Sequence, residues 1–143
     1  MQKLVDQIDT KIAVANSGGA VAPLVATKVD ATGYGRARFV FNFGSGAATT
    51  AALSAGIGIW AATTSGGTYT AIAGASLAAV SSGLISGTNL VMAIDVPITN
   101  GSPWLQVSGG SMLSSSINNS ATVDLYRQVY RPDIEGYQQV ISV

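Results

Sequence analysis

Side chains that could do chemistry are scarce in this chain of 143 residues, which contains neither His nor Cys. Without these residues it cannot form a Ser-His-Asp triad, a thiol nucleophile or a Cys/His zinc site. None of Lys3, Lys11 and Lys28 stands in a motif resembling a Ser-Lys dyad, and no phosphate-binding loop of the form GxxxxGK is present. The inventory therefore predicts a protein that is not an enzyme.

Two pairs of carboxylates have spacings that suggest a metal or acid–base site. Asp133 and Glu135 would point to the same side of an extended segment, as in a carboxylate pair or a calcium site. They lie in a Pro- and Gly-containing stretch with no third ligand nearby, so solvated charges are favoured. Asp6 and Asp9 would share one face of a helix, where they fit the polar side of an amphipathic segment better than a metal site. We predict no metal and no cofactor.

Charged residues are few and evenly balanced, at seven basic and seven acidic, and they make up 10% of the chain. This balance predicts neither nucleic-acid nor anionic-membrane binding. No Asp, Glu, Lys or Arg occurs between Arg38 and Asp95. Part of that stretch, residues 44–63, has the length of a membrane-spanning helix, but its glycines and hydroxyl residues argue against one. The stretch fits a core, a surface solvated by Ser and Thr, or a surface covered by a neighbouring chain.

The elements that would position these side chains are predicted to be strands. The strongest signal is RARFVFNFG at residues 36–44, which places Phe39, Phe41 and Phe43 on one face of a sheet. Further strands are predicted at 24–29, 55–62, 68–72, 77–80, 90–96, 104–107 and 121–130, and Asn100-Gly101 predicts a hairpin. About seven to eight short antiparallel strands indicate an all-β fold, a β-sandwich or jelly roll, with a closed barrel as the nearest alternative.

Two kinds of side chain within these strands allow a functional interpretation beside a structural one. Arg36 and Arg38 share a strand face, so they could form cross-strand ion pairs with Asp95 or Asp124 or face an acidic patch on a partner. The tryptophans at positions 60 and 104, with the five tyrosines, allow a sugar-binding platform, although tryptophans more often fill a core or a subunit contact.

The two ends of the chain lie outside this strand pattern. We predict an N-terminal arm and hinge at residues 1–19, a sandwich domain at 20–132 and a C-terminal arm at 133–143. The first arm has apolar residues at near-helical spacing and also alternation, so a short helix and an extended arm both stay open. Each arm either packs on its own domain or reaches a neighbour, in the C-terminal case by strand addition. The predicted partner-contact residues are Leu4, Val5, Ile8, Ile12, Arg36, Arg38, Tyr137, Val140 and Ile141.

Several pieces in a fixed order resemble small phage head proteins, the decoration or cement proteins encoded near major capsid genes. These pieces are VDATGYGRARFVFNFG (29–44), GGTYTAIAGASL (66–77), PWLQV (103–107) and VDLYRQVYRP (123–132). The resemblance spans residues 23–132 and carries no catalytic residue. It implies a β-sandwich, made in the host cytoplasm, that binds the capsid exterior of the virion as a dimer or trimer and bridges capsomers. Its partners would be the major capsid protein and further copies of itself. A tail, neck or fibre protein and a carbohydrate-binding module are the alternatives.

Overall fold

The computed structural model describes residues 8–18, 26–44, 53–78, 90–112, 118–127 and 139–142, and these form nine strands and no helix. None of this part of the chain could therefore cross a membrane as a helix. The strands are β1 (Ile8–Gly18), β2 (Val29–Asp30), β3 (Arg36–Gly44), β4 (Leu53–Ala62), β5 (Thr70–Leu77), β6 (Leu90–Pro97), β7 (Trp104–Met112), β8 (Asn118–Tyr126) and β9 (Gln139–Ser142).

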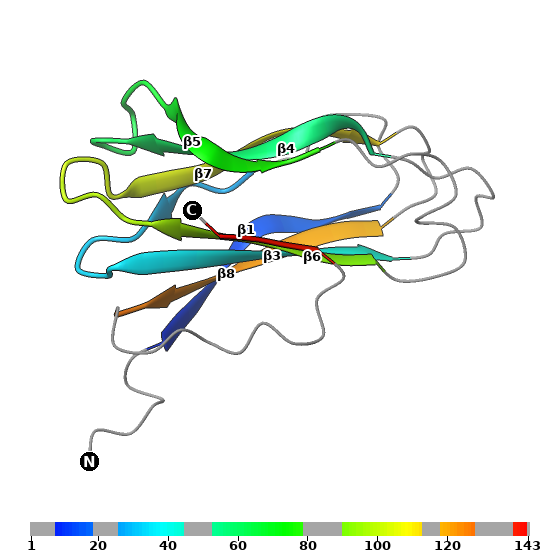
Figure 1. The fold of residues 1–143 in the computed structure, drawn as a ribbon, viewed down its shortest axis with the longest axis horizontal. Helices are drawn as coiled ribbons and strands as arrows, with labels where there is room; N and C mark the ends of the chain where they lie inside the picture. The colour runs from blue at the N-terminus through cyan, green and yellow to red at the C-terminus, as the bar shows by residue number, and fades with distance from the viewer. Residues whose placement is uncertain are drawn as a thin grey trace, which may run out of the picture.

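The strands form two layers, which are seen nearly edge-on in Figure 1. The five-stranded sheet has the order β1-β8-β3-β6-β9, and the four-stranded sheet has the order β2-β7-β4-β5. All neighbouring strands are antiparallel except β6 and β9, which are parallel. The predicted all-β sandwich is confirmed.

The core lies between the two layers and is built by strict alternation along the strands. In β3, Phe39, Phe41 and Phe43 are at most 1% exposed and face the four-stranded sheet. Ile57 and Ile59 of β4 come from that opposite sheet and are fully buried. Each of these large apolar side chains contributes about 1.5–3 kcal/mol through burial. The row of phenylalanines predicted from the sequence is therefore the centre of the core.

The N-terminal segment is extended, and its described part belongs to the same domain. β1 pairs with β8 in antiparallel fashion, and Ile8 lies opposite Tyr126. Ala13 and Val14 are buried in the core, so the segment is held by packing as well as by the ladder. Of the two conformations that the sequence left open for this segment, the strand is the observed one for residues 8–18. Leu4 and Val5 lie outside the described residues.

The C-terminal segment contributes a strand to its own sheet. β9 runs parallel to β6, with Ile141 opposite Ile94, and it forms the end of the five-stranded sheet opposite to β1. This corresponds to the alternative in which the tail completes a sheet edge of its own domain. Tyr137 and the side chains of Val140 and Ile141 lie outside the described part of the chain.

The hairpin predicted at Asn100-Gly101 is wrong. The two residues form a turn, in which the Ser102 N–H donates to the Thr99 carbonyl oxygen at 3.0 Å. However, the turn joins β6 of one sheet to β7 of the other. Neither turn residue has a positive φ, whereas the tight turn that Asn-Gly favours in hairpins needs φ above zero at both positions. Both edges of β6 are occupied by β3 and β9, so β7 has no place beside it.

Strands β5 and β7 extend beyond the predicted ends at residues 72 and 107, and each includes a glycine with an unusual backbone conformation. β5 continues through Gly74, and β7 continues through Gly109, both of which have positive φ. At Gly109 the reason for glycine is also steric. A Cβ atom there would lie 2.4 Å from the carbonyl oxygen of Gly56 on β4, closer than any real Cβ contact. This glycine therefore lets β7 approach β4 closely where Gly109 pairs with Ile57.

Candidate functional site

A buried ionic cluster lies on the outer face of the five-stranded sheet. Asp95 of β6 accepts hydrogen bonds from Arg36 Nε at 2.7 Å, from Arg38 Nη2 at 3.2 Å and from the Tyr126 hydroxyl. Asp95 is 0% exposed and Arg38 is 1% exposed. The register explains the cluster, because Arg38 lies directly opposite Asp95 on one side and Asp124 on the other. Of the two cross-strand pairs expected for the arginines, the one with Asp95 is confirmed.

Electrostatics in this cluster favour a structural role. Burial is the largest cause that raises the pKa of Tyr126, and the hydrogen bond to Asp95 adds to it by holding the proton, so that the pKa reaches about 12. Burial by itself would lower the pKa of Arg36, but the hydrogen bond and charge of Asp95 outweigh it, so that this pKa lies above its ordinary value. Arg36 therefore remains a cation and Tyr126 a neutral donor at physiological pH. The cluster joins strands β3, β6 and β8.

The predicted contact of Arg38 with a partner is corrected by its burial. A guanidinium that is 1% exposed and ion-paired to Asp95 has no surface left for an acidic patch on another molecule. Arg36 keeps a side chain that is 18% exposed. Tyr126, the third donor to Asp95, was not among the predicted site residues. Tyr126 lies opposite Arg36 in the register of β8 with β3. Because this register depends on the pairing of distant strands, the sequence alone did not indicate it.

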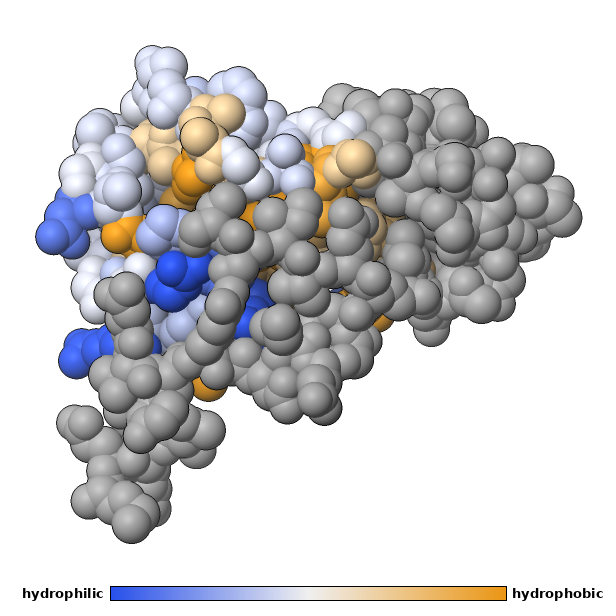
Figure 2. All heavy atoms as spheres, in the orientation of Figure 1, coloured by the Kyte–Doolittle hydropathy of each residue, from blue (hydrophilic) through white to orange (hydrophobic). Residues whose placement is uncertain are grey.

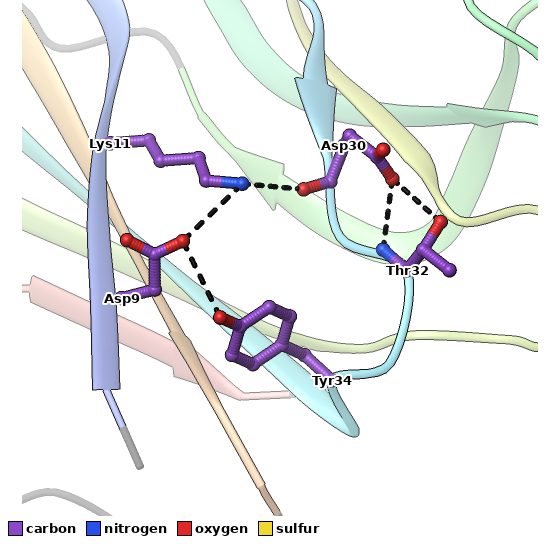
Figure 3. A network of polar contacts seen from close by, with 5 residues as sticks. All are labelled: Asp9, Lys11, Asp30, Thr32 and Tyr34. Atoms are coloured by element: carbon purple, nitrogen blue, oxygen red, sulfur yellow. Dashed lines mark hydrogen bonds and ion pairs between the residues drawn. The ribbon is translucent and has the colours of Figure 1, made fainter. Parts of the chain in front are cut away.

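A second polar network ties the two sheets together at the β1 edge (Figure 3). Lys11 of β1 donates to the backbone oxygen of Asp30 on β2 at 2.9 Å and lies 3.4 Å from the Asp9 carboxylate. The Tyr34 hydroxyl donates to Asp9 at 3.4 Å. Thr32 donates to the Asp30 carboxylate through its hydroxyl, at 2.6 Å, and its backbone N–H, at 3.0 Å. These two bonds lower the pKa of Asp30.

This second network gives no indication of a metal site. The described residues contain no group of three side chains suited to hold a metal ion. Asp9 is engaged with Lys11 and Tyr34 rather than with a second carboxylate. Asp6, Asp133 and Glu135, the other residues weighed as metal ligands, lie outside the described residues. The network is best understood as a link between the sheets.

The outer face of β1 exposes apolar side chains at the edge of the sheet. Ile8 is 39% exposed and Ile12 is 63% exposed, and among the described residues they are the large apolar side chains that are exposed. Thr10 lies between them and donates to Asp124 at 2.6 Å, which places all three on the outer face, because alternate residues share a face. We call Ile8, Thr10 and Ile12 the β1 strip. Two of the predicted partner-contact residues thus belong to one surface.

The outer face of the four-stranded sheet is a second candidate surface. Cross-strand pairs share a face, and the register sets Trp60 beside Gln106, Ala62 beside Trp104 and Gly58 beside Ser108. We call these six residues the tryptophan face. Both tryptophans and Gln106 are partly exposed. Strands β4, β5 and β7 contain no Asp, Glu, Lys or Arg.

The hydropathy of the surface agrees with this distribution of charge. In Figure 2 the described surface over the four-stranded sheet is mostly pale or orange, and most strongly hydrophilic groups lie lower in the view, toward the five-stranded sheet. The uncharged stretch between Arg38 and Asp95 therefore contributes both core residues and exposed surface, as β4 shows with its buried Ile59 and partly exposed Trp60.

No family model and no curated protein sequence matches the chain. Among solved structures, one of the infectious bursal disease virus Gx strain has a TM-score of 0.44 at 20% identity, over 87% of this chain and 33% of that one. An equine rhinitis A virus capsid has a TM-score of 0.41 at 16% identity, over 93% and 82%. Bacillus endospore appendages, described as disulfide-linked pili, have a TM-score of 0.41 at 9% identity, over 85% and 88%. At these values the likeness supports no inference about function.

Proposed function

We propose that this chain is a non-catalytic structural protein of a virion, which binds the outer capsid surface through the β1 strip and stabilises contacts between capsomers. The observation that carries the proposal is the exposure of Ile8 and Ile12, at 39% and 63%, on one face of an edge strand. The resemblance of residues 23–132 to phage decoration proteins supplies the class of partner, the major capsid protein.

An edge strand with an apolar outer face is suited to contact another protein. The outer edge of such a strand presents backbone N–H and C=O groups that can pair with a strand of a partner. The isolated bridge between Val14 and Ala26 occupies only one end of this edge. Charges on the inward face of β1 do not oppose docking, because Lys11 bonds to Asp9 and to the Asp30 backbone. Burial of each isoleucine would contribute at most about 1.5–3 kcal/mol.

Modest affinity at each strip is compatible with stable attachment. A dimer or trimer that holds two or three strips against neighbouring capsomers would gain avidity from the second and third contacts. The same geometry would bridge capsomers. A tail, neck or fibre protein could use the strip in the same way, so the experiment must supply capsids that carry no tail.

The test is cosedimentation of the purified protein with tailless capsids assembled without it. We expect the wild-type protein to bind, and Ile8→Asp/Ile12→Asp to bind at least about tenfold more weakly, since each substitution places a charge in an apolar contact. Thr99→Asp, in the exposed turn between β6 and β7, is the matched control and should bind like the wild type. If the wild-type protein does not cosediment with capsids, the proposed function is rejected. If the double variant binds as well as the wild type, only the role of the β1 strip as the contact surface is rejected.

A further inference from the structure

Both tryptophans of the chain lie on one face of one sheet. Trp60 lies opposite Gln106 and Trp104 lies opposite Ala62 on the paired strands β4 and β7. The two indoles therefore occupy diagonal positions, whose Cβ atoms in antiparallel sheets are separated by about 7–8 Å or slightly less. The chain has no other tryptophan. Two large aromatic rings thus stand side by side on a surface rather than in the core.

The indole of Trp60 lies along its own strand. A Cβ atom built on Gly58 would be 3.5 Å from Trp60 Nε1 and 3.7 Å from Trp60 Cδ1. The ring therefore extends over the glycine, two residues back on the same face. Because Gly58 has no side chain, the indole can lie low against the sheet. Its flanking neighbours across the sheet are Ala71 on β5 and Gln106 on β7, and alanine is too small to cover it.

Polar groups on this face could hydrogen-bond to a neutral ligand. Gln106 carries both a donor and an acceptor, and the Ser108 and Ser76 hydroxyls can do either. Serines flank Gly58 on both sides, at Ser76 of β5 and Ser108 of β7. Beside Trp104, on β2, lies Asp30, whose Oδ1 is fixed by Thr32. Among the described residues no protein acceptor is found for either indole N–H.

We propose that the tryptophan face is a binding site for a neutral glycan. The C–H face of a pyranose ring stacks on an aromatic ring, whose electron-rich face attracts it, and the sugar hydroxyls pair with amide and hydroxyl groups. Two adjacent rings at this spacing match the scale of neighbouring sugar units. Strands β4, β5 and β7 carry no charge, and the Asp30 carboxylate beside Trp104 would repel an anion, so the site favours a neutral ligand over an anionic one.

The composition of the face favours a glycan over a protein partner. Between residues 56 and 62 of β4, 71 and 76 of β5 and 104 and 108 of β7, the positions that share it are occupied by Gly, Ala, Ser, Gln and Trp. The core of a protein–protein interface is usually enriched in Met and Arg beside its aromatics. The inference does not depend on the proposed function, because the β1 strip belongs to the other sheet.

Intrinsic tryptophan fluorescence, excited selectively over the tyrosines, is a direct assay, because both tryptophans of the chain lie on this face. We would titrate the full chain with neutral hexasaccharides of glucose, mannose, xylose and N-acetylglucosamine, and with an oligogalacturonate as the anionic comparison. The expected result is a saturable blue shift with at least one neutral oligomer and none with the anionic one. For that oligomer, calorimetry should show that Trp60→Ala and Trp104→Ala each weaken binding about tenfold.

A third variant tests the orientation of Trp60 without removing a ring. Gly58→Val should lift the indole and weaken binding about fivefold or more, while the β-branched residue keeps the strand stable. Thr122→Val, on β8 of the other sheet, is the matched control and should bind normally. The proposal is overturned if no neutral oligomer binds saturably, or if the two alanine variants bind the oligomer unchanged. It is also overturned if the wild type binds no oligomer and the same variants instead lose attachment to capsids, since the face would then be a protein interface.

Discussion

Replacement of Asp95 by Asn should destabilise the fold far more than replacement of any surface carboxylate. Asp95 is fully buried and accepts hydrogen bonds from Arg36, Arg38 and Tyr126. Asparagine keeps the shape of the side chain but removes the charge that faces the buried Arg38. Breaking a buried ion pair in this way costs about 3–5 kcal/mol. That is a large part of the roughly 5–15 kcal/mol by which a domain is stable.

Urea unfolding at neutral pH, followed by far-UV circular dichroism, measures this loss. With an m-value of about 2 kcal/mol per molar urea, the midpoint should fall by about 2 M. Arg38→Met/Asp95→Asn should recover at least half of the loss, because the double variant buries no guanidinium at position 38. Asp124→Asn is the control, since Asp124 is partly exposed, and it should cost less than about 1 kcal/mol. The reasoning is refuted if Asp95→Asn costs less than about 1 kcal/mol, or if the double variant is no more stable than the single one.

Two further predictions concern pH and backbone geometry. The pKa of Tyr126 is about 12 in the folded protein, against about 10 when unfolded. Its stabilising contribution is thus complete below pH 10 and is lost between pH 10 and 12, by roughly 2 kcal/mol. Urea unfolding at about pH 9 and about pH 11.5 should show this loss in the wild type and a smaller one in Tyr126→Phe; equal losses would contradict it. Gly109→Ala should cost at least about 3 kcal/mol in thermal unfolding and Gly33→Ala about 1 kcal/mol. Both glycines have positive φ, but a Cβ atom added at Gly109 would lie 2.4 Å from a backbone oxygen, whereas one added at Gly33 would have no atom within 4 Å. Similar costs for the two would show that the contact at Gly109 is relieved.

The local pattern of apolar residues was sufficient to predict the central strands. The bounds of β3 match RARFVFNFG without adjustment, and β6 differs from the predicted 90–96 only by including Pro97. In β3 the phenylalanines give a clear period of two, whereas β6 was predicted from its nearly continuous apolar run. A cross-strand pair of the arginines with Asp95 was one of the expected alternatives, because oppositely charged residues lay on strands that could adjoin. The complete burial of Arg38 and Asp95 was not expected, since alternation placed both residues on the face of the sheet away from the core.

Features that depend on pairing between distant segments could not be predicted in the same way. β1 carries Lys11 and Asp9 on its inward face, so its apolar residues do not alternate as in β3, and a helix fitted its spacing equally well. The turn at Asn100-Gly101 has a local hairpin signature, but its strands separate into different sheets. The tryptophan face likewise depends on the register of β4 with β7. The sequence identified the tryptophans as candidates for a sugar-binding surface, but only the pairing of β4 with β7 places them side by side.

The pairing of β1 with β8 also has a kinetic consequence. Ile8 lies opposite Tyr126, so nearly the whole chain must leave the ribosome before the first described strand finds its neighbour. Folds dominated by such distant contacts fold slowly, in milliseconds to seconds, because loop closure precedes the gain from pairing. Until then the apolar residues of β1 lack their partner, and a nascent chain in this state is open to aggregation. The sparse charge of the sequence offers little electrostatic repulsion against it. Expression at reduced temperature, which slows synthesis and weakens hydrophobic association, should therefore raise the soluble yield.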